Sequence, residues 1–229
     1  MLGPVVNALA IIVCSLMGRY LIRNVPERVE NIIMKAIAVA LIYIGISGAM
    51  DNENFLLLLM SLIVGSVIGE LINIDKGMNN LGQWAEKKLG VQGEGKFTKG
   101  FVTATILYCS GSMVIIGSLE SGLTGTHQML FTKSILDGIV SVILASQYGL
   151  GVLFSAVPLF IYETAIVLGA SFVKDWLTPL IITEMSAVGA LLIAVIGFNI
   201  LEIKEIKVAN MIPAVFMPWI FIAIGNAIF

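Results

Sequence analysis

The sequence predicts an all-α membrane protein whose helices form a polytopic bundle of about eight transmembrane spans. Hydrophobic residues make up 58% of the chain and charged residues only 12%, whereas soluble domains carry about 25% charged residues. The apolar residues gather in stretches close to the ~20 residues that a spanning helix needs. Most Lys and Arg residues lie between these stretches, which is typical of the loops that set membrane topology.

We expect the spans to form a single membrane domain over residues 1–229. The predicted spans are 4–22, 31–50, 55–74, 100–119, 131–147, 150–172, 179–200 and 209–229. No basic leader precedes the first span, so we expect a retained helix rather than a cleaved signal peptide. The polar run 51–54 predicts a turn after the second span, and 146–149 predicts a tight connection after the fifth.

One connection is long, residues 75–99, and it contains a candidate amphipathic helix at 84–89. Gly90, Gly93 and Gly95 then interrupt the pattern. Two interpretations stay open for this segment. It could lie on the membrane surface with its apolar side toward lipid, or it could be an ordinary solvated loop.

The basic residues also predict an orientation. They cluster in the first, third and seventh connections, whereas the second has none and the sixth has only Lys174, beside Asp175. Because basic loops are retained in the cytoplasm, we predict that the odd-numbered connections face the cytoplasm. With eight spans, both termini then lie outside.

The fourth span contains an unusual run of small polar residues, Cys109, Ser110, Gly111 and Ser112. Glycine at this position permits a broken helix, whose exposed backbone groups can bind ions or solutes. Small residues also allow two helices to pack closely without any ligand. Both interpretations stay open, and Ser110 and Ser112 are kept as candidate binding residues.

The fifth span carries two opposite charges, Lys133 and Asp137. Residues four apart lie on one face of a helix, so the two charges could simply neutralise each other. Ionisable groups within a membrane usually face a bundle interior or a wet cavity. We therefore predict that Asp137 faces a polar cavity and binds a cation or a proton.

Two further carboxyl groups lie within predicted spans. Glu163 is close to the middle of the sixth span, with no basic residue near it in sequence. Either another helix supplies its partner or it is protonated, and both states suit proton or cation coupling. Glu184 lies in the first turns of the seventh span, where the helix dipole favours an acid; its alternative role is to gate a site.

Amides and prolines mark the remaining candidate positions. Asn7, Asn199 and Asn210 could cap helices, bridge them or contact a solute. Of these, Asn210 is retained as a candidate binding residue. Pro218 lies deeper in the eighth span and predicts a kink or a break near Trp219.

Several classes of protein are not expected. No phosphate-binding glycine loop, GxSxG motif or HExxH motif occurs, so we expect neither an enzyme nor an ATP-driven pump. No metal-ligand spacing surrounds His127, and we expect no metal or cofactor. The net charge of −2 gives no indication of a nucleic-acid partner. Cys14 and Cys109 lie in apolar segments, which argues against a disulfide.

Several stretches together resemble the domain of unknown function 554 family of bacterial membrane proteins. They are YCSGSM at 108–113, GSLESGL at 117–123, KSILDG at 133–138, GLGVLFSA at 149–156, GSVIGE at 65–70 and NMIPA at 210–214. The resemblance implies a multi-pass protein of the bacterial inner membrane, sometimes described as a transporter, and supplies no substrate. It also implies that many relatives carry glutamine at position 163, so that a charge there is not essential to a shared activity.

The sequence therefore predicts a secondary transporter or exchanger of a small polar solute or ion, driven by a proton or cation gradient. Its candidate binding residues are Ser110, Ser112, Lys133, Asp137, Glu163, Glu184 and Asn210. The alternatives are a passive ion channel and a membrane sensor or scaffold that transports nothing. The expected partners are the lipid bilayer and the solute, and small residues at the helix seams would also allow a homodimer.

Overall fold

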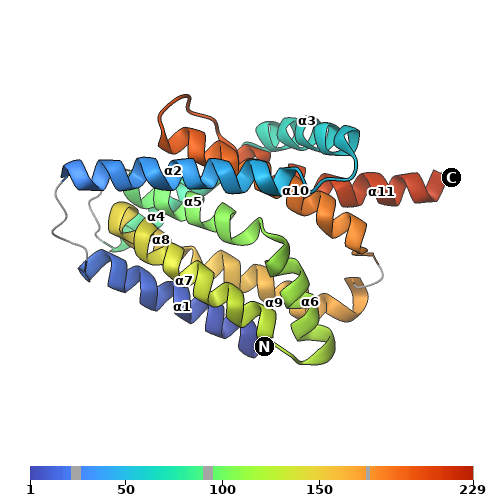
Figure 1. Cartoon of the computed structure of the whole chain (residues 1–229), viewed down its shortest axis with the longest axis horizontal. Coiled ribbons are helices and arrows are strands. Elements are labelled where there is room, and N and C mark those ends of the chain that lie inside the picture. The colour runs from blue at the N-terminus through green and yellow to red at the C-terminus, as the bar shows by residue number, and fades with distance from the viewer. Residues whose placement is uncertain (22–26, 90–94, 174–175, 229) are drawn as a thin grey trace. The chain divides into compact units, whose positions relative to one another are not determined.

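A computed structural model describes residues 1–21, 27–89, 95–173 and 176–228 (Figure 1). Its elements are α1 (Leu2–Leu21), α2 (Glu27–Ala49), α3 (Phe55–Ile72), α4 (Ile74–Leu89), α5 (Lys96–Cys109), α6 (Ser112–Thr124), α7 (Gln128–Tyr148), α8 (Leu150–Phe154), α9 (Ala156–Val173), α10 (Pro179–Ile200), the 3₁₀ helix η1 (Val208–Phe216) and α11 (Met217–Ile228). These described ranges contain no strand. The predicted all-α class is confirmed.

The helices also match the predicted number of spans. Within the described ranges, seven helical segments are long and apolar enough to cross a membrane, and a bent pair raises the number to as many as eight. The seven are Leu2–Tyr20, Asn31–Ala49, Phe55–Ile72, Gln128–Tyr148, Leu150–Phe172, Pro179–Ile200 and Val208–Gly225. The chain is therefore a multi-pass membrane protein whose spanning helices contact the lipid bilayer.

The fourth predicted span is the bent pair. The segments Lys96–Cys109 and Met113–Thr124 meet at an angle of 60°. Ser110 and Gly111 lie between α5 and α6 and are not helical. Glycine is a poor helix former because the unfolded chain gives up most conformational freedom there. The fourth helix is therefore broken, which is one of the two interpretations that the sequence left open.

Two other spans are irregular. The eighth begins as the nine-residue 3₁₀ helix η1, which contains Pro213, and becomes α-helical at Met217. The change of helix type thus precedes the predicted position near Trp219, and Pro218 falls in the first turn of α11, where proline is tolerated. The sixth span is interrupted at Ser155, between α8 and α9, a break that the sequence did not lead us to expect.

The long connection starts differently from the prediction. Its helix, α4, begins at Ile74 rather than at residue 84. Asn73 ends α3 in the left-handed conformation, with φ of 58°, and its side chain accepts a hydrogen bond from Lys76 N at 3.3 Å. Asparagine tolerates this conformation and also caps helix starts, so one residue ends α3 and starts α4. Leu81 and Trp84 of α4 are exposed.

The described chain divides into two compact units, while the expectation of a single domain stays a prediction. The first comprises residues 1–31, 77–109 and 113–173, and the second comprises residues 32–76, 110–112 and 174–229. The first unit thus holds α1 and α5 to α9, with most of α4. The second holds α3, α10, η1 and α11, with most of α2.

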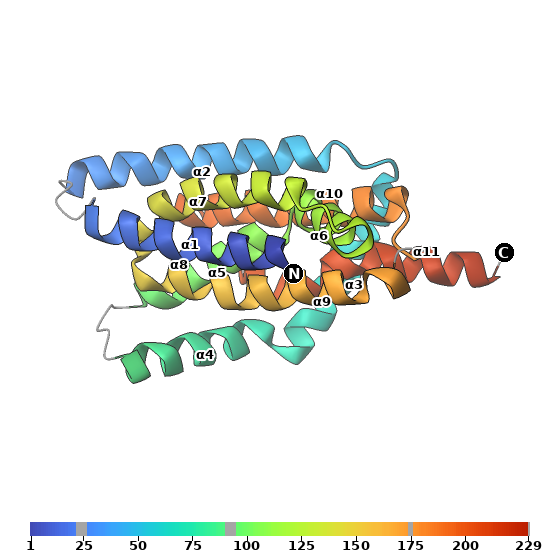
Figure 2. The ribbon, with the colours of Figure 1, turned by 90° about the horizontal axis from the view of Figure 1, so that it is seen from below.

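Helices α1 and α7 form the closest pair in the first unit (Figure 2). A Cβ added at Gly18 of α1 would overlap the backbone carbonyl of Val142, and one added at Gly138 of α7 would lie 3.0 Å from Cys14 Sγ. The two contacts follow the same order along both helices, so α1 and α7 run in the same direction. Small residues thus let the two backbones touch.

Glycines have the same role in the second unit. Gly65 and Gly69 of α3 leave room only for the backbone of η1, at Ala214 and Asn210 respectively. Gly197 of α10 lies against the backbone of α2 at Ala38. Close helix contacts at glycine residues are therefore present within both units.

Gly18→Ala should weaken the α1–α7 pair. A methyl group there overlaps the Val142 carbonyl, and overpacking of this kind costs about 1–3 kcal/mol. We expect a lower thermal unfolding temperature in detergent, read from intrinsic fluorescence or from aggregation. Gly169→Ala is the matched control, because a Cβ added there meets nothing within 4 Å; equal destabilisation by both substitutions would contradict the close contact.

Candidate functional site

A buried ion pair on α7 forms the centre of the candidate site. Lys133 and Asp137 are joined by a salt bridge, and they are only 5% and 8% exposed. Their spacing of four residues places them on one face of the helix. The structure therefore brings these two predicted residues together inside the first unit rather than on its surface.

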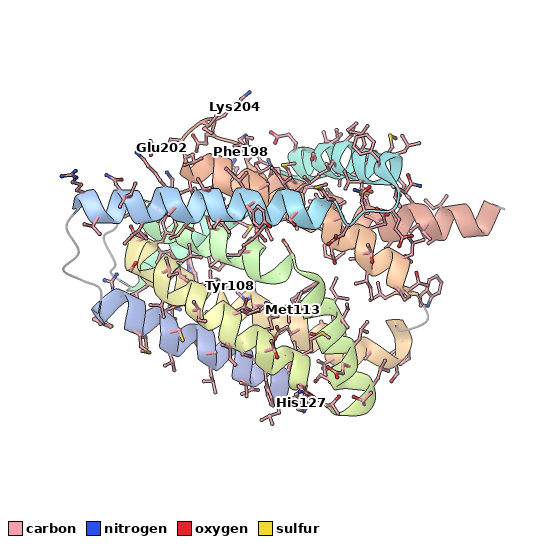
Figure 3. All side chains as sticks on the ribbon, in the orientation of Figure 1. Tyr108, Met113, His127, Phe198, Glu202 and Lys204 are labelled. Carbon is pink, nitrogen blue, oxygen red and sulfur yellow. The ribbon has the colours of Figure 1, made fainter. Side chains whose placement is uncertain are left out.

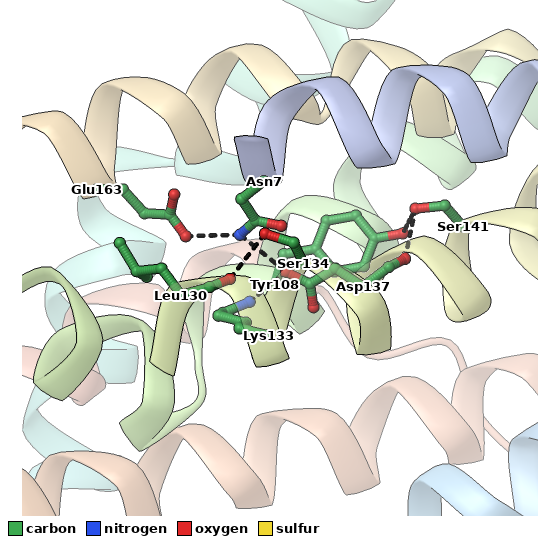
Figure 4. A network of polar contacts seen from close by, with 8 residues as sticks. All are labelled: Asn7, Tyr108, Leu130, Lys133, Ser134, Asp137, Ser141 and Glu163. Carbon is green, nitrogen blue, oxygen red and sulfur yellow. Dashed lines mark hydrogen bonds and ion pairs between the residues drawn. The ribbon is translucent and has the colours of Figure 1, made fainter. Parts of the chain in front are cut away.

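Asn7 of α1 connects this pair to a second carboxyl group (Figure 4). Its Nδ2 donates to Asp137 Oδ2 at 3.2 Å and to Glu163 Oε1 of α9 at 2.7 Å. Asn7 is fully buried, with 0% of its surface exposed. A single amide group thus holds two carboxyl groups from different helices.

Glu163 is the most enclosed charged residue of this cluster, at 0% exposure. Its Oε1 accepts the bond from Asn7, but its Oε2 is buried without a hydrogen-bond partner in the part of the chain that the structure describes. The amide oxygen Oδ1 of Asn7 is likewise buried and unpartnered there. Such groups are rare in folded proteins and call for an explanation.

Tyr108 of α5, which Figure 3 labels on the ribbon, also lies close to the pair (Figure 4). Its ring centre lies 5.9 Å from Lys133 Nζ, within the range of a cation–π contact. Its hydroxyl lies 2.6 Å from Ser141 Oγ, and Ser141 Oγ donates to the backbone carbonyl of Asp137 at 2.7 Å. Because Ser141 has one proton to donate, Tyr108 is the donor between the two hydroxyls.

The charges of this cluster do not balance when every group is ionised. One ammonium, Lys133, faces two carboxyl groups, Asp137 and Glu163. No other ion pair reaches either carboxyl group among the residues that the structure describes. Charges inside an apolar environment are costly unless they are compensated, so the cluster as a whole favours one additional positive charge.

The serines of the broken fourth span lie at the helix break. Ser110 is buried, and its backbone carbonyl packs against Gly189 of α10 within the second unit. The side chain of Ser112 falls outside the described part of the chain. Their predicted role as hydroxyl ligands stays a prediction.

Glu184 belongs to the second unit and holds the start of α3. Its Oε1 accepts hydrogen bonds from the backbone N–H groups of Glu53 at 2.8 Å and Asn54 at 2.9 Å. An acid at a helix N-terminus satisfies donors that lack partners within the helix. The terminus concerned is that of α3, however, and not that of α10, on which Glu184 lies.

Asn210 belongs to the second unit too, and it joins three elements. Its Nδ2 donates to Glu70 of α3 at 2.6 Å, and its Oδ1 accepts from the backbone N–H of Asp75 in α4 at 2.6 Å. Asn210 itself lies on η1. These contacts fit the bridging role that the sequence suggested for this asparagine, and its role in solute binding stays a prediction.

Three residues of the cluster were not among the predicted binding residues. Asn7 is an isolated amide in an apolar helix. That position suggested that it bridges helices, but it did not identify the residues that it contacts. Tyr108 and Ser141 are common residue types within spans, and nothing in their spacing indicates that they meet. Their contacts link positions 33 residues apart, and those of Asn7 link positions 130 and 156 apart.

The structure offers no donor set for a metal in the cluster. Across the described residues, no group of three or more His, Cys, Asp or Glu side chains is placed to hold a metal ion. The donors that face the two carboxyl groups are instead N–H groups, from Asn7 and Lys133. The carboxyl groups of this arrangement can take up and release protons.

A sequence profile described as protein of unknown function (DUF554) matches residues 2–223. A Bacillus subtilis (strain 168) protein named uncharacterized membrane protein YdfK is 31% identical over 231 residues, covering 99% of this chain and 98% of that protein. An Escherichia coli (strain K12) protein named uncharacterized protein YqgA is 29% identical over 223 residues, covering 94% of each. No solved structure matches the chain.

Lys133→Met should be strongly destabilising, because it leaves Asp137 buried without its ammonium partner. Removing one member of a buried pair costs about 3–5 kcal/mol. Adding Asp137→Leu to Lys133→Met should restore part of the lost thermal stability in detergent, since the carboxyl group that lost its ammonium partner is then removed as well.

Lys207→Met is the control for this experiment, because Lys207 pairs with Glu70 on the surface with 57% of its side chain exposed. Its effect should be much smaller, since water and salt screen exposed pairs. Equal losses of thermal stability in the two single variants would contradict the burial of the Lys133–Asp137 pair.

Proposed function

The chain belongs to the family described as protein of unknown function (DUF554), and on that premise we propose that it is a secondary transporter or exchanger. It moves a small polar solute or ion across the membrane. The energy comes from a proton or cation gradient, because the sequence contains no ATP-binding motif.

One observation supports this proposal above the others. Lys133, Asp137 and Glu163 are buried together around the amide of Asn7, on segments otherwise apolar enough to span a membrane. Ionisable groups at membrane depth are expensive and mark ion pathways and proton relays by default. Three spanning helices, α1, α7 and α9, contribute to the cluster, so a change of its charge could alter their packing.

The break between α5 and α6 is a second observation that supports the proposal. Non-helical backbone at membrane depth is tolerated only beside protein or a water-filled cavity. Transporters build solute sites from such discontinuous helices. Tyr108, one residue before the end of α5, contacts the charged cluster through Ser141.

The proposal includes the cellular setting. The protein resides in the bacterial cytoplasmic membrane with both termini outside, acts as a carrier and not as an enzyme, and forms a homodimer through helix seams of small residues. Glu184 and Asn210 serve the packing of the second unit, where their carboxylate and amide groups bind backbone N–H groups of neighbouring elements.

Reconstitution tests transport directly. Purified protein in liposomes, given a proton or sodium gradient, should take up one member of a panel of small anions, cations, amino acids and sugars with saturable kinetics. Asp137→Asn should reduce that uptake to background while the protein still elutes as a single species in gel filtration. Lys207→Gln, at the exposed pair, should leave uptake unchanged.

The same assay separates the alternatives. Movement that does not saturate and ignores the gradient would indicate a passive channel. If no solute moves, the transporter proposal fails in favour of a sensor or scaffold. If a solute moves and both Asp137→Asn and Glu163→Gln leave its uptake intact, the coupling to a proton or cation fails.

Thiol labelling tests the orientation. Thr126→Cys lies in the connection between α6 and α7, and Lys204→Cys lies in the connection between α10 and η1; both native residues are exposed. A reagent that cannot cross membranes should label the first in intact cells and the second only after lysis. The reverse pattern would place the termini in the cytoplasm.

A further inference from the structure

Glu163 and Asp137 differ in their hydrogen-bond and ion-pair partners. Asp137 receives the ammonium of Lys133 as well as the amide of Asn7, whereas Glu163 receives only the Asn7 donor among the described residues. Glu163 is fully buried and its Oε2 lacks a partner there. A buried carboxylate with one neutral donor is poorly compensated, and such a group takes up a proton instead.

A metal cation does not fit at this place. Oε2 of Glu163 and Oδ1 of Asn7 each expose less than 1 Å², so the described structure leaves no room for an ion beside them. Hard cations also require about six oxygen ligands, and the cluster presents N–H groups to the carboxyl oxygens instead. A proton needs neither the volume nor the additional ligands.

The orientation of the Asn7 amide follows from its two neighbours. Its Nδ2 is directed at Asp137 Oδ2 and Glu163 Oε1. Reversing the amide would place its carbonyl oxygen 2.7 Å from Glu163 Oε1, where two acceptors repel each other unless one of them carries a proton. The N–H side of the amide therefore faces the carboxyl groups, and that side also repels a metal cation.

We propose that Glu163 is the residue that binds and releases the coupling proton, and that Asn7 is the positioning residue whose hydrogen bond to Glu163 sets the pH at which that proton binds. This inference rests on the proposed function, because it identifies the coupling ion of that same site, and it concerns this chain and not relatives that carry glutamine at position 163. The carboxylate of Glu163 takes one proton from water on one side of the membrane, on Oε2, and becomes a neutral carboxylic acid. The same O–H bond breaks when the proton is released to the other side.

Among the described residues, the titratable groups that act on Glu163 come from α7 and α5. On α7 they are Lys133 and Asp137, and on α5 it is Cys109. On α1 it is the neutral amide of Asn7. With Asp137 held by Lys133, the net charge of the cluster changes from zero to minus one when Glu163 ionises.

Infrared difference spectroscopy on the purified full-length protein tests this directly, without any transported solute. Lowering the pH should produce the carbonyl-stretch band of a protonated carboxylic acid. Glu163→Gln, a neutral isostere, should remove that band and keep the fold in gel filtration. Asp137→Asn should keep a titrating band, and replacing potassium chloride with sodium chloride should not displace it.

The effect of Asn7 on the protonation of Glu163 can be measured with the same infrared band. Asn7→Ala removes the donor to Glu163 Oε1, and hydrogen bonds to charged groups contribute about 1.5–3 kcal/mol. The band should then persist to a pH about one to two units higher, a shift that a purely structural role would not produce. Asn7→Asp replaces the N–H donor with a carboxyl oxygen of the same size, so the band should again persist to a higher pH and stay insensitive to sodium.

The outcomes separate this inference from the proposed function. A native spectrum without a band assignable to Glu163, or a native band that sodium displaces, would overturn the inference even if the protein transports a solute. A band that titrates, disappears in Glu163→Gln and shifts in Asn7→Ala would support it. Those results would stand even if the liposomes move no solute.

Discussion

The cost of burying charge away from water is the constraint on which this structure depends. Lys133, Asp137 and Glu163 lie in helices that otherwise consist of apolar residues, and each unpaired charge there would cost several kcal/mol. One salt bridge, between Lys133 and Asp137, and one amide, which donates to both carboxyl groups, compensate these charges in part. Because these partners come from α1, α7 and α9, satisfying the charges also specifies which helices must be neighbours within the first unit.

Close packing of the α1 and α7 backbones makes the hydrogen bond between Asn7 and Asp137 possible. The Asn7 side chain is short, so α1 must approach α7 closely before its amide can reach Asp137. Gly18 and Gly138 provide that approach because neither carries a side chain at the contact. The second unit uses the same principle at Gly65 and Gly69, where α3 meets η1. In lipid, where apolar surface has little reason to leave its surroundings, such van der Waals contact and polar bonds hold helices together.

The sequence predicted the features that depend on composition and on spacing within a helix. Hydrophobicity identified the spans, and the spacing of Lys133 and Asp137 placed both on one face of α7. The interruption at Ser110 and Gly111 followed from poor helix formers in an apolar run. The rest depends on tertiary contacts: the bond between Asn7 and Glu163 joins positions 156 residues apart, and no periodicity indicates it. The start of α4 at Asn73 and the break at Ser155 depend on local conformation. They could not be predicted from the sequence, because asparagine and serine also occur in many other conformations.

The 3₁₀ helix η1 has a geometric consequence for the last span. A 3₁₀ helix rises about 2.0 Å per residue, whereas an α-helix rises about 1.5 Å, so the nine residues of η1 cover about 18 Å instead of about 13.5 Å. The twelve residues of α11 add about 18 Å more. Together the two helices are long enough to cross a hydrocarbon layer of about 30 Å. The half formed by η1 is narrower than an α-helix and needs fewer residues for the same length. Because residues three apart eclipse each other in such a coil, Asn210, Pro213 and Phe216 form a straight row along it.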